Sequence, residues 1–286
     1  MESISNLRKI CQSTRPSIFS DFLSRIYYKL SIYFTWVCLR LNMTANQVTV
    51  LSGFFTIIGA LLLSSDSKWI TLLGVICFHL FAILDMSDGE VARYRKEGGV
   101  EGHFLDWYMH FISSSALMIG LFLASYKSLN SLVLILAGLI AVTIPILDKT
   151  VQNAGWTVIC WTRLRDINNN SNKLDINPPL VSKSSKNETK SWLFRRLRFL
   201  LLSPLQDHWI PLVLLILAVI DLVLSLFQIT FIDYRFLMLM YIGIVGPIYI
   251  IYNVRLMVVS KSLHKGYQRL INPDRKMVFP EDDFLG

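Results

Sequence analysis

The chain has 286 residues, of which 53% are hydrophobic and only 17% are charged, and its mean hydropathy is +0.48. This composition is too apolar for a soluble enzyme, a disulfide-rich secreted module or a disordered tail, and it excludes all three. The net charge of +8 suits contact with anionic lipid headgroups better than contact with nucleic acid. We therefore expect an integral membrane protein that contacts membrane lipid and has no nucleic-acid partner.

Residues 1–45 are expected to form a cytoplasmic N-terminus that contains an interfacial helix. Between residues 17 and 41, apolar side chains recur at steps of three and four, while Arg25, Lys29 and Arg40 fall on other faces. A helix of this kind lies along the headgroup layer of the membrane. The chain is expected to turn at residues 42–46 into its first span.

Six apolar runs are long enough to cross a hydrocarbon layer of about 30 Å, which takes a helix of about 20 residues. The runs are continuous rather than alternating, so they predict helices and exclude a β-barrel. The predicted fold is therefore all-α, a polytopic six-transmembrane-helix bundle with an N-terminal interfacial amphipathic helix, and residues 46–260 are its catalytic membrane domain. The predicted spans are residues 46–64, 68–84, 104–125, 128–147, 209–227 and 234–254.

The positive charges predict how the bundle is oriented. Lysine and arginine collect in cytoplasmic loops, and of the 28 in this chain only Lys68, Lys127 and Arg235 fall in the loops of one side. The long basic connection at 148–208 and the tail at 261–286 fall on the other side, with the N-terminus. Both termini, and the polar ends of the spans on that side, are expected to be cytoplasmic.

The stretch at 85–110, DMSDGEVARYRKEGGVEGHFLDWYMH, lies where the second span leaves the membrane and the third re-enters it. Asp106 and His110 are four residues apart, so they share one helical face at the start of the third span. The end of the second span presents a similar face, which is expected to converge with them. The residues of that face are Asp85, Asp88, Gly89, Ala92 and Arg93.

Carboxylates at the end of a span are costly to desolvate together unless a cation neutralises them, so this cluster indicates a divalent metal site. Oxygen ligands favour Mg²⁺ or Mn²⁺, and such ions bind phosphates. Gly89 and Ala92 lack bulk, so a nucleotide fits against the helix backbone, and Arg93 offers a planar fork of donors. The residues indicate a diphosphate-binding site with one or two metal ions.

The order Asp-x2-Asp-Gly-x2-Ala-Arg-x8-Gly-x3-Asp, from Asp85 to Asp106, resembles the signature of the CDP-alcohol phosphotransferases, also called CDP-alcohol phosphatidyltransferases. These are integral membrane enzymes, and their pattern ends in a fourth Asp, where this chain has His110. The segment Ala45-Asn46-Gln47-Val48-Thr49 is similar to the Pro-Asn-x-x-Thr that opens the family's first span.

The resemblance implies a reaction in which an acceptor hydroxyl attacks the β-phosphorus of a CDP-linked alcohol, CMP leaves and a phosphodiester forms. It implies that Asp85, Asp88 and Asp106 hold the metal, and that Lys149 and Arg255 receive an anionic group of the acceptor. It also implies a homodimer. The residues it assigns to the cytidine diphosphate are Gly89, Ala92, Arg93, Asn46 and Thr49, beside the metal-holding Asp85 and Asp88.

The departure at His110 bears on the mechanism, because an imidazole brings no negative charge and cannot ligate a metal and accept a proton through the same nitrogen. We expect His110 to be the base, since the ordinary pKa of imidazole, about 6.5, suits proton transfer at neutral pH. Asp106 is the second candidate catalytic residue. The alternatives for His110 are a metal ligand and a packing residue. Because three carboxylates are present instead of the four in the family pattern, we expect weaker metal binding or a preference for Mn²⁺.

The donor is expected to be CDP-diacylglycerol, which would give a phospholipid. A water-soluble CDP-alcohol, used to make a lipid or glycan product, is the alternative, and a non-catalytic CDP-binding membrane protein is the alternative from another class. Asp221, inside the fifth span, is expected to make a structural hydrogen bond to a neighbouring helix.

Overall fold

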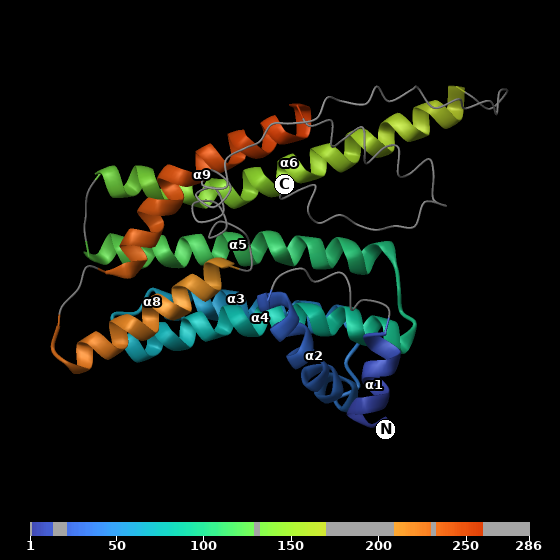
Figure 1. Cartoon of the computed structure of the whole chain (residues 1–286), viewed down its shortest axis with the longest axis horizontal. Coiled ribbons are helices and arrows are strands. Elements are labelled where there is room, and N and C mark those ends of the chain that lie inside the picture. The colour runs from blue at the N-terminus through green and yellow to red at the C-terminus, as the bar shows by residue number, and fades with distance from the viewer. Residues whose placement is uncertain (1, 14–21, 129–131, 170–208, 230–232, 260–286) are drawn as a thin grey trace, which may run out of the picture. The chain divides into compact units, whose positions relative to one another are not determined.

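The structure is a computed structural model of the whole chain, and it describes residues 2–13, 22–128, 132–169, 209–229 and 233–259. The tail at 261–286 and most of the connection at 148–208 lie outside these ranges. Within them the protein has eight helices and no strand (Figure 1). The helices are α1 (Ile4–Cys11), α2 (Phe22–Arg40), α3 (Ala45–Leu63), α4 (Lys68–Arg95), α5 (Val100–Ser128), α6 (Leu132–Asn169), α8 (Trp209–Leu226) and α9 (Tyr234–Val259).

Six of the described helices are long and apolar enough to cross a membrane, namely α3, α4, α5, α6, α8 and α9. The chain is thus a multi-pass integral membrane protein with an all-α fold, as predicted. It divides into two compact units. Unit 1 is formed by Met1–Leu147 with Pro204–Pro247, and unit 2 by Asp148–Ser203 with Ile248–Gly286. Helices α6 and α9 contribute to both units.

Helix α4 runs well beyond the predicted end of the second span at residue 84. The three- and four-residue spacing continues after the apolar run, so the helix continues to Arg95. It ends because Lys96 adopts the left-handed conformation, with φ of 57°, and its backbone N–H turns back to the carbonyls of Ala92 and Arg93. The part of the motif from Asp85 to Arg93 therefore lies on one uninterrupted helix.

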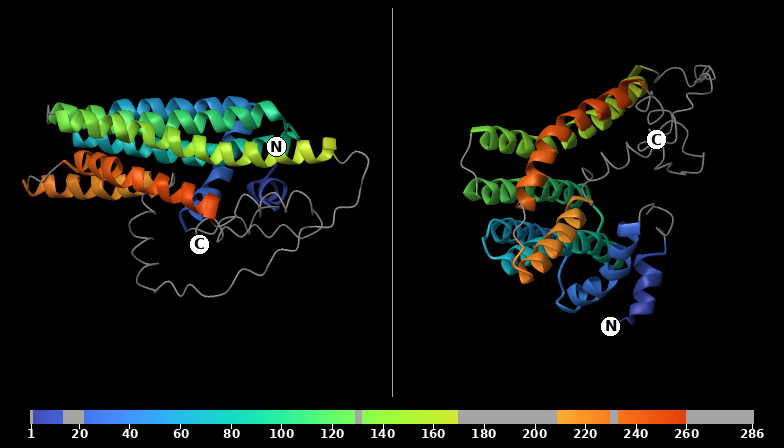
Figure 2. Two further views of the ribbon diagram at one scale, coloured as in Figure 1. Left: turned by 90° about the horizontal axis from the view of Figure 1, so that it is seen from above. Right: turned by 60° about the vertical axis from the view of Figure 1, so that its left-hand side comes forward.

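Helix α3 packs against both α4 and α5 (Figure 2). Glycines permit the close approach. A Cβ on Gly74 of α4 would lie 2.7 Å from the backbone nitrogen of Leu63, and a Cβ on Gly120 of α5 would lie 2.8 Å from the carbonyl oxygen of Ala60. Backbones that meet at such distances need residues without side chains. These contacts join the C-terminal end of α3 to the first part of α4 and to α5.

The predicted N-terminal helix is present as α2, which begins at Phe22, while residues 17–21 lie outside the described part of the chain. One stripe of α2 is apolar and exposed, and the opposite face packs on α4. That buried face carries the hydroxyls of Tyr27, Ser31 and Thr35, and of these only Tyr27 belongs to the apolar pattern of the sequence. The exposed stripe consists of Phe22, Leu30, Tyr33 and Val37.

Helix α1 was not predicted, because residues 1–15 look polar in sequence. It begins where the Ser3 hydroxyl accepts the backbone N–H of Asn6, and it buries Leu7 and Cys11, one turn apart, against Ile32 of α2. Both α1 and α2 lie at the end of α4 that carries Arg95, as Figure 1 shows. The N-terminal segment therefore packs beside the polar motif.

The other end of unit 1 is joined by ion pairs. Lys68 of α4 donates to the Asp221 carboxylate of α8 at 2.8 Å, which confirms the predicted structural hydrogen bond of Asp221. Arg235, at the start of α9, pairs with Asp233 and also donates to the carbonyl oxygens of Leu63 and Ser65 at 2.9 and 2.6 Å. These contacts tie α8 and α9 to the α3–α4 connection.

Candidate active site

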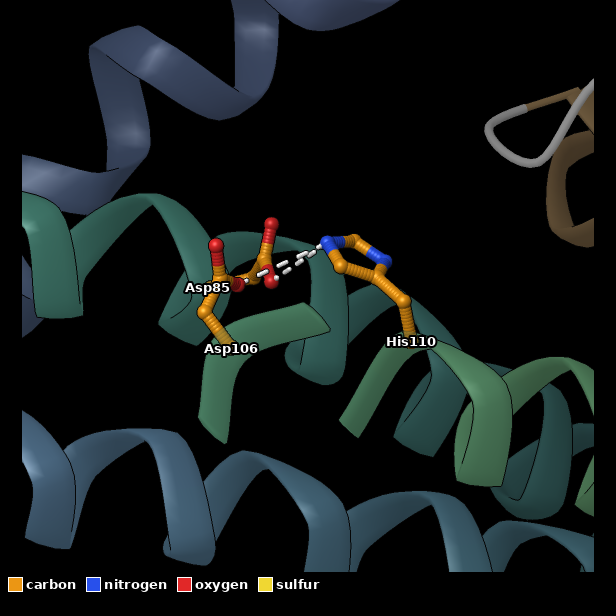
Figure 3. Close-up of side chains that lie close together, drawn as sticks. All are labelled: Asp85, Asp106 and His110. Carbon is orange, nitrogen blue, oxygen red and sulfur yellow. Dashed lines mark ion pairs between the residues drawn. The ribbon is translucent and has the colours of Figure 1, made fainter. Parts of the chain in front are cut away.

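Three side chains of the motif point toward one another between α4 and α5 (Figure 3). The Nε2 atom of His110 lies 3.1 Å from an Asp85 carboxylate oxygen and 3.6 Å from an Asp106 carboxylate oxygen. Asp85 comes from α4, whereas Asp106 and His110 are four residues apart on α5. All three are partly buried, so the cluster is still reached from outside the bundle.

This cluster is chemically suited to a divalent cation. One potential ligand atom from each residue lies within 4.8 Å of the others. The Asp85 Oδ1 atom is buried and has no hydrogen-bond partner within the described part of the chain, although a buried carboxylate oxygen ordinarily has one. A cation shared by Asp85, Asp106 and His110 would satisfy that atom, and two carboxylates with an imidazole suit Mn²⁺ as well as Mg²⁺.

Asp88, predicted as a third metal-holding carboxylate, is the most buried of the motif acids and is only 7% exposed. Its Oδ2 atom accepts a hydrogen bond of 2.6 Å from the hydroxyl of Thr49 on α3. Asp88 lies outside the three-residue cluster of possible metal ligands. Thr49 was predicted to contact the nucleotide, and in the structure it orients Asp88.

Arg93 and Gly89, both predicted to hold the diphosphate, lie against each other on α4. A Cβ on Gly89 would sit 3.3 Å from the Nη1 atom of Arg93, so the absent side chain leaves room for the guanidinium. The Nε atom of Arg93 donates a hydrogen bond of 2.7 Å to the carbonyl oxygen of Cys11, at the end of α1. Ala92, predicted for the same role, is half-buried beside Arg93.

The small residue Gly102, which belongs to the motif, lies against Asn46. A Cβ on Gly102 would lie 3.3 Å from the Oδ1 atom of Asn46, so the N-terminal end of α3 and the start of α5 meet there. Asn46 itself is exposed. The segment 45–49 and the motif are thus brought together from separate parts of the sequence, as their joint resemblance suggests.

Two further residues of this region were not singled out from the sequence. Phe81, one turn before Asp85, presents its ring to the imidazole of His110 edge to face, with centroids 5.6 Å apart, and so fixes the plane of that ring. Glu90 is completely buried between α4 and α2. A charged side chain next to the motif glycine was the available signal for Glu90, whereas nothing in the sequence marks Phe81 among many aromatic residues.

Lys149 of α6 and Arg255 of α9, predicted to receive the acceptor, both belong to unit 2. Lys149 is half-buried and Arg255 is exposed. Between the same two helices, Asn253 donates a hydrogen bond of 3.2 Å to the carboxylate of Asp148. The acceptor roles of Lys149 and Arg255 stay predictions.

Residues 42–164 match the family model described as CDP-alcohol phosphatidyltransferase. Over this segment the chain is similar to that family. The match contains all of α3, α4 and α5, and therefore every residue of the cluster described above, and the family is made up of transferases. A search of curated proteins found no match to the chain.

Proposed function

We propose that the protein transfers a phosphoalcohol group from a CDP-linked donor to an acceptor hydroxyl and releases CMP. The observation that carries the proposal is the meeting of Asp85, Asp106 and His110 between α4 and α5, inside the family segment. In the reaction, the acceptor oxygen forms a bond to the β-phosphorus of the donor. The bond from that phosphorus to the bridging oxygen breaks, and the bridging oxygen leaves with CMP.

His110 takes the proton of the acceptor hydroxyl in this proposal. One ring nitrogen, Nε2, faces the two carboxylates, and Figure 3 shows the other, Nδ1, directed away from them. With its N–H on Nε2, toward the carboxylates, a neutral imidazole carries its lone pair on Nδ1, where it accepts a proton. Asp85 and Asp106 then stabilise the imidazolium, as a carboxylate does in other base-assisted transfers.

The donor's diphosphate is held by this chain's own residues on α4, with Arg93 as the positive group and Gly89 as the surface without a side chain. Asp85, Asp88 and Asp106 are the acids proposed to hold Mg²⁺ or Mn²⁺. A divalent ion bound there would neutralise negative charge on the phosphate oxygens. Thr49 keeps Asp88 oriented toward the same end of the helices.

The proposed donor is CDP-diacylglycerol, with a phospholipid as product, because the site lies on membrane-spanning helices that a lipid donor can approach from the bilayer. The motif is equally compatible with a water-soluble CDP-alcohol, since it recognises only the part of the donor that the two classes share. The site is proposed to face the cytoplasm, on the basis of the charge asymmetry described above.

The experiment that tests the transferase uses purified protein in lipid, supplied with one donor class at a time, a mixture of polyol and phosphopolyol acceptors, and Mg²⁺ or Mn²⁺. Asp88→Asn, which keeps the size of the side chain and removes its charge, serves as the matched blank. CMP release above that blank, with a lipid-soluble product, supports CDP-diacylglycerol as donor. Release only with water-soluble donors supports the alternative class, and CDP binding without CMP from any donor contradicts the proposal.

A further inference from the structure

The fully buried carboxylate of Glu90 is not used by the chemistry proposed above. It accepts three short hydrogen bonds, from the hydroxyls of Ser31 and Thr35 at 2.6 Å each and from the side-chain amide of Gln12 at 2.7 Å. The first two come from α2, and the third comes from the residue that follows α1. Burying a carboxylate is costly without such partners, so its position has to be explained by what it holds in place.

Glu90 and Arg93 form hydrogen bonds with two consecutive residues at the end of α1. They are three residues apart on α4, hence one turn apart on adjoining parts of its surface. Glu90 accepts from the side chain of Gln12, and Arg93 donates from Nε to the carbonyl oxygen of Cys11, in both cases at 2.7 Å. The carbonyls in the last turn of a helix lack partners within the helix and favour a cation, so Arg93 suits that position.

Further contacts hold the same turn of α1 in place. The Gln12 side chain also donates to the carbonyl oxygen of Tyr28 at 2.7 Å, and the Tyr28 hydroxyl donates to the carbonyl oxygen of Gln12 at 2.9 Å. Cys11 is completely buried in an apolar cluster with Leu7 and Ile32. The N-terminal segment is therefore docked by specific polar contacts as well as by apolar packing.

We propose that Cys11 and Gln12, at the end of α1, form one wall of the donor site. Glu90 is a positioning residue: it holds Gln12, and the neighbouring Cys11 carbonyl in turn fixes the Arg93 guanidinium for the donor's diphosphate. The inference rests on the proposed function, because it assigns the diphosphate to Arg93. The same guanidinium lies against Gly89 and is tied at Nε to the Cys11 carbonyl, so its rotamer depends on α1 being docked. Donor binding and the docking of α1 then stabilise each other.

The test measures donor affinity in three variants of the full-length protein in lipid. Gln12→Ala and Glu90→Gln loosen the wall, the second with little change of size, and Arg8→Ala is the control. Arg8 also joins α1 to α2, through the carbonyl oxygen of Lys29, but its bond of 3.3 Å is exposed and does not involve Glu90. We expect KM for the CDP donor to rise about tenfold in the first two variants, the loss of one hydrogen bond to a charged group, with little change in kcat or in KM for the acceptor.

Cys11 provides a second readout that does not require turnover. Burial raises the pKa of its thiol to about 11, with the Glu90 carboxylate adding to the effect and Arg93 opposing it, so the docked thiol is nearly all protonated at neutral pH and reacts slowly. In a Cys160→Ser background, which removes the exposed cysteine, we expect Gln12→Ala to speed maleimide labelling of Cys11. CDP is expected to slow this labelling, while Cys38, buried elsewhere, serves as the internal reference.

The outcomes separate the wall from the transferase. If CDP slows the labelling of Cys11 while the wild type releases no CMP from any donor, Cys11 and Gln12 do line the CDP site but the transferase proposal fails. If the wild type releases CMP and Gln12→Ala exposes Cys11 without changing KM for the donor, α1 is only a structural part and the wall is wrong. An equal rise of KM in Arg8→Ala would also overturn it.

Discussion

Replacing His110 by alanine tests proton transfer at the proposed active site. The imidazole contacts the Asp85 and Asp106 carboxylates, at 3.1 and 3.6 Å, and packs against Phe81. The residues assigned to the diphosphate, Gly89 and Arg93, lie further along α4 and contact each other. The substitution therefore removes the proposed base and leaves the diphosphate-binding part of the site in place.

The size of the effect follows from that geometry. A positioned general base contributes about 10²- to 10⁴-fold to the rate, so we expect kcat to fall by that factor in His110→Ala. KM for the donor should change by no more than about threefold from the wild-type value. The substitution leaves the donor-binding residues in place, so it removes no binding that the ground state and the transition state share. His110→Asp restores a carboxylate where the family pattern has one, and we expect it to recover most of the lost turnover.

The assay is CMP release at saturating donor, measured across a range of pH and Mn²⁺ concentrations. A base must be unprotonated to act, so the wild-type rate should fall as the pH drops through the pKa of the base. The rate of His110→Ala should not show this fall at low pH. If His110→Ala regains full turnover at saturating Mn²⁺, the imidazole is a metal ligand rather than the base. Full turnover in His110→Ala at every Mn²⁺ concentration would show that His110 is neither the base nor a metal ligand.

Two further predictions concern α3 and its contacts. Thr49→Val removes the 2.6 Å bond to the buried Asp88 and should lower both CMP release and stability, the latter by about 1–3 kcal/mol. Thr56→Val is the matched control, since Thr56 is equally buried on α3 but bonds only to its own helix, and equal activity losses in the two would contradict the role given to Thr49. Gly74→Ala should lower the Tm of the protein in detergent by many degrees, because its Cβ would lie 2.7 Å from a backbone nitrogen. Gly98→Ala, with nothing within 4 Å, should leave Tm unchanged, and similar Tm values for both would show that α3 and α4 are less closely packed than described.

The helical fold follows closely from the sequence, because length and hydropathy alone decide which segments cross a membrane. The continuation of α4 to Arg95 is also implied by the three- and four-residue spacing of the motif, although hydropathy by itself ends the span at residue 84. The cluster of Asp85, Asp106 and His110 follows from the same spacing on two helices joined by a short turn. In each case the signal lies within a short stretch of sequence.

The contacts that the sequence did not reveal join stretches that are far apart. Glu90 is held by hydroxyls of α2 more than fifty residues away, and a Ser or Thr among apolar residues gives no sign of which carboxylate it will meet. Helix α1 was not predicted because its apolar face is small and consists of Leu7 and Cys11 with a few neighbours. The link between Asp88 and Thr49 depends on how α3 packs on α4, which close contacts at glycines decide.

The cluster of Asp85, Asp106 and His110 between α4 and α5 is proposed to carry out CMP-releasing transfer. The most direct test is metal-dependent CMP release by the wild type and by Asp85→Asn, side by side, after removal of metal with EDTA and re-addition of Mg²⁺ or Mn²⁺. We predict that the wild type releases CMP only when metal is restored and that Asp85→Asn, which still binds CDP, releases none. Equal release by the two proteins, or release that survives EDTA, would contradict the claim.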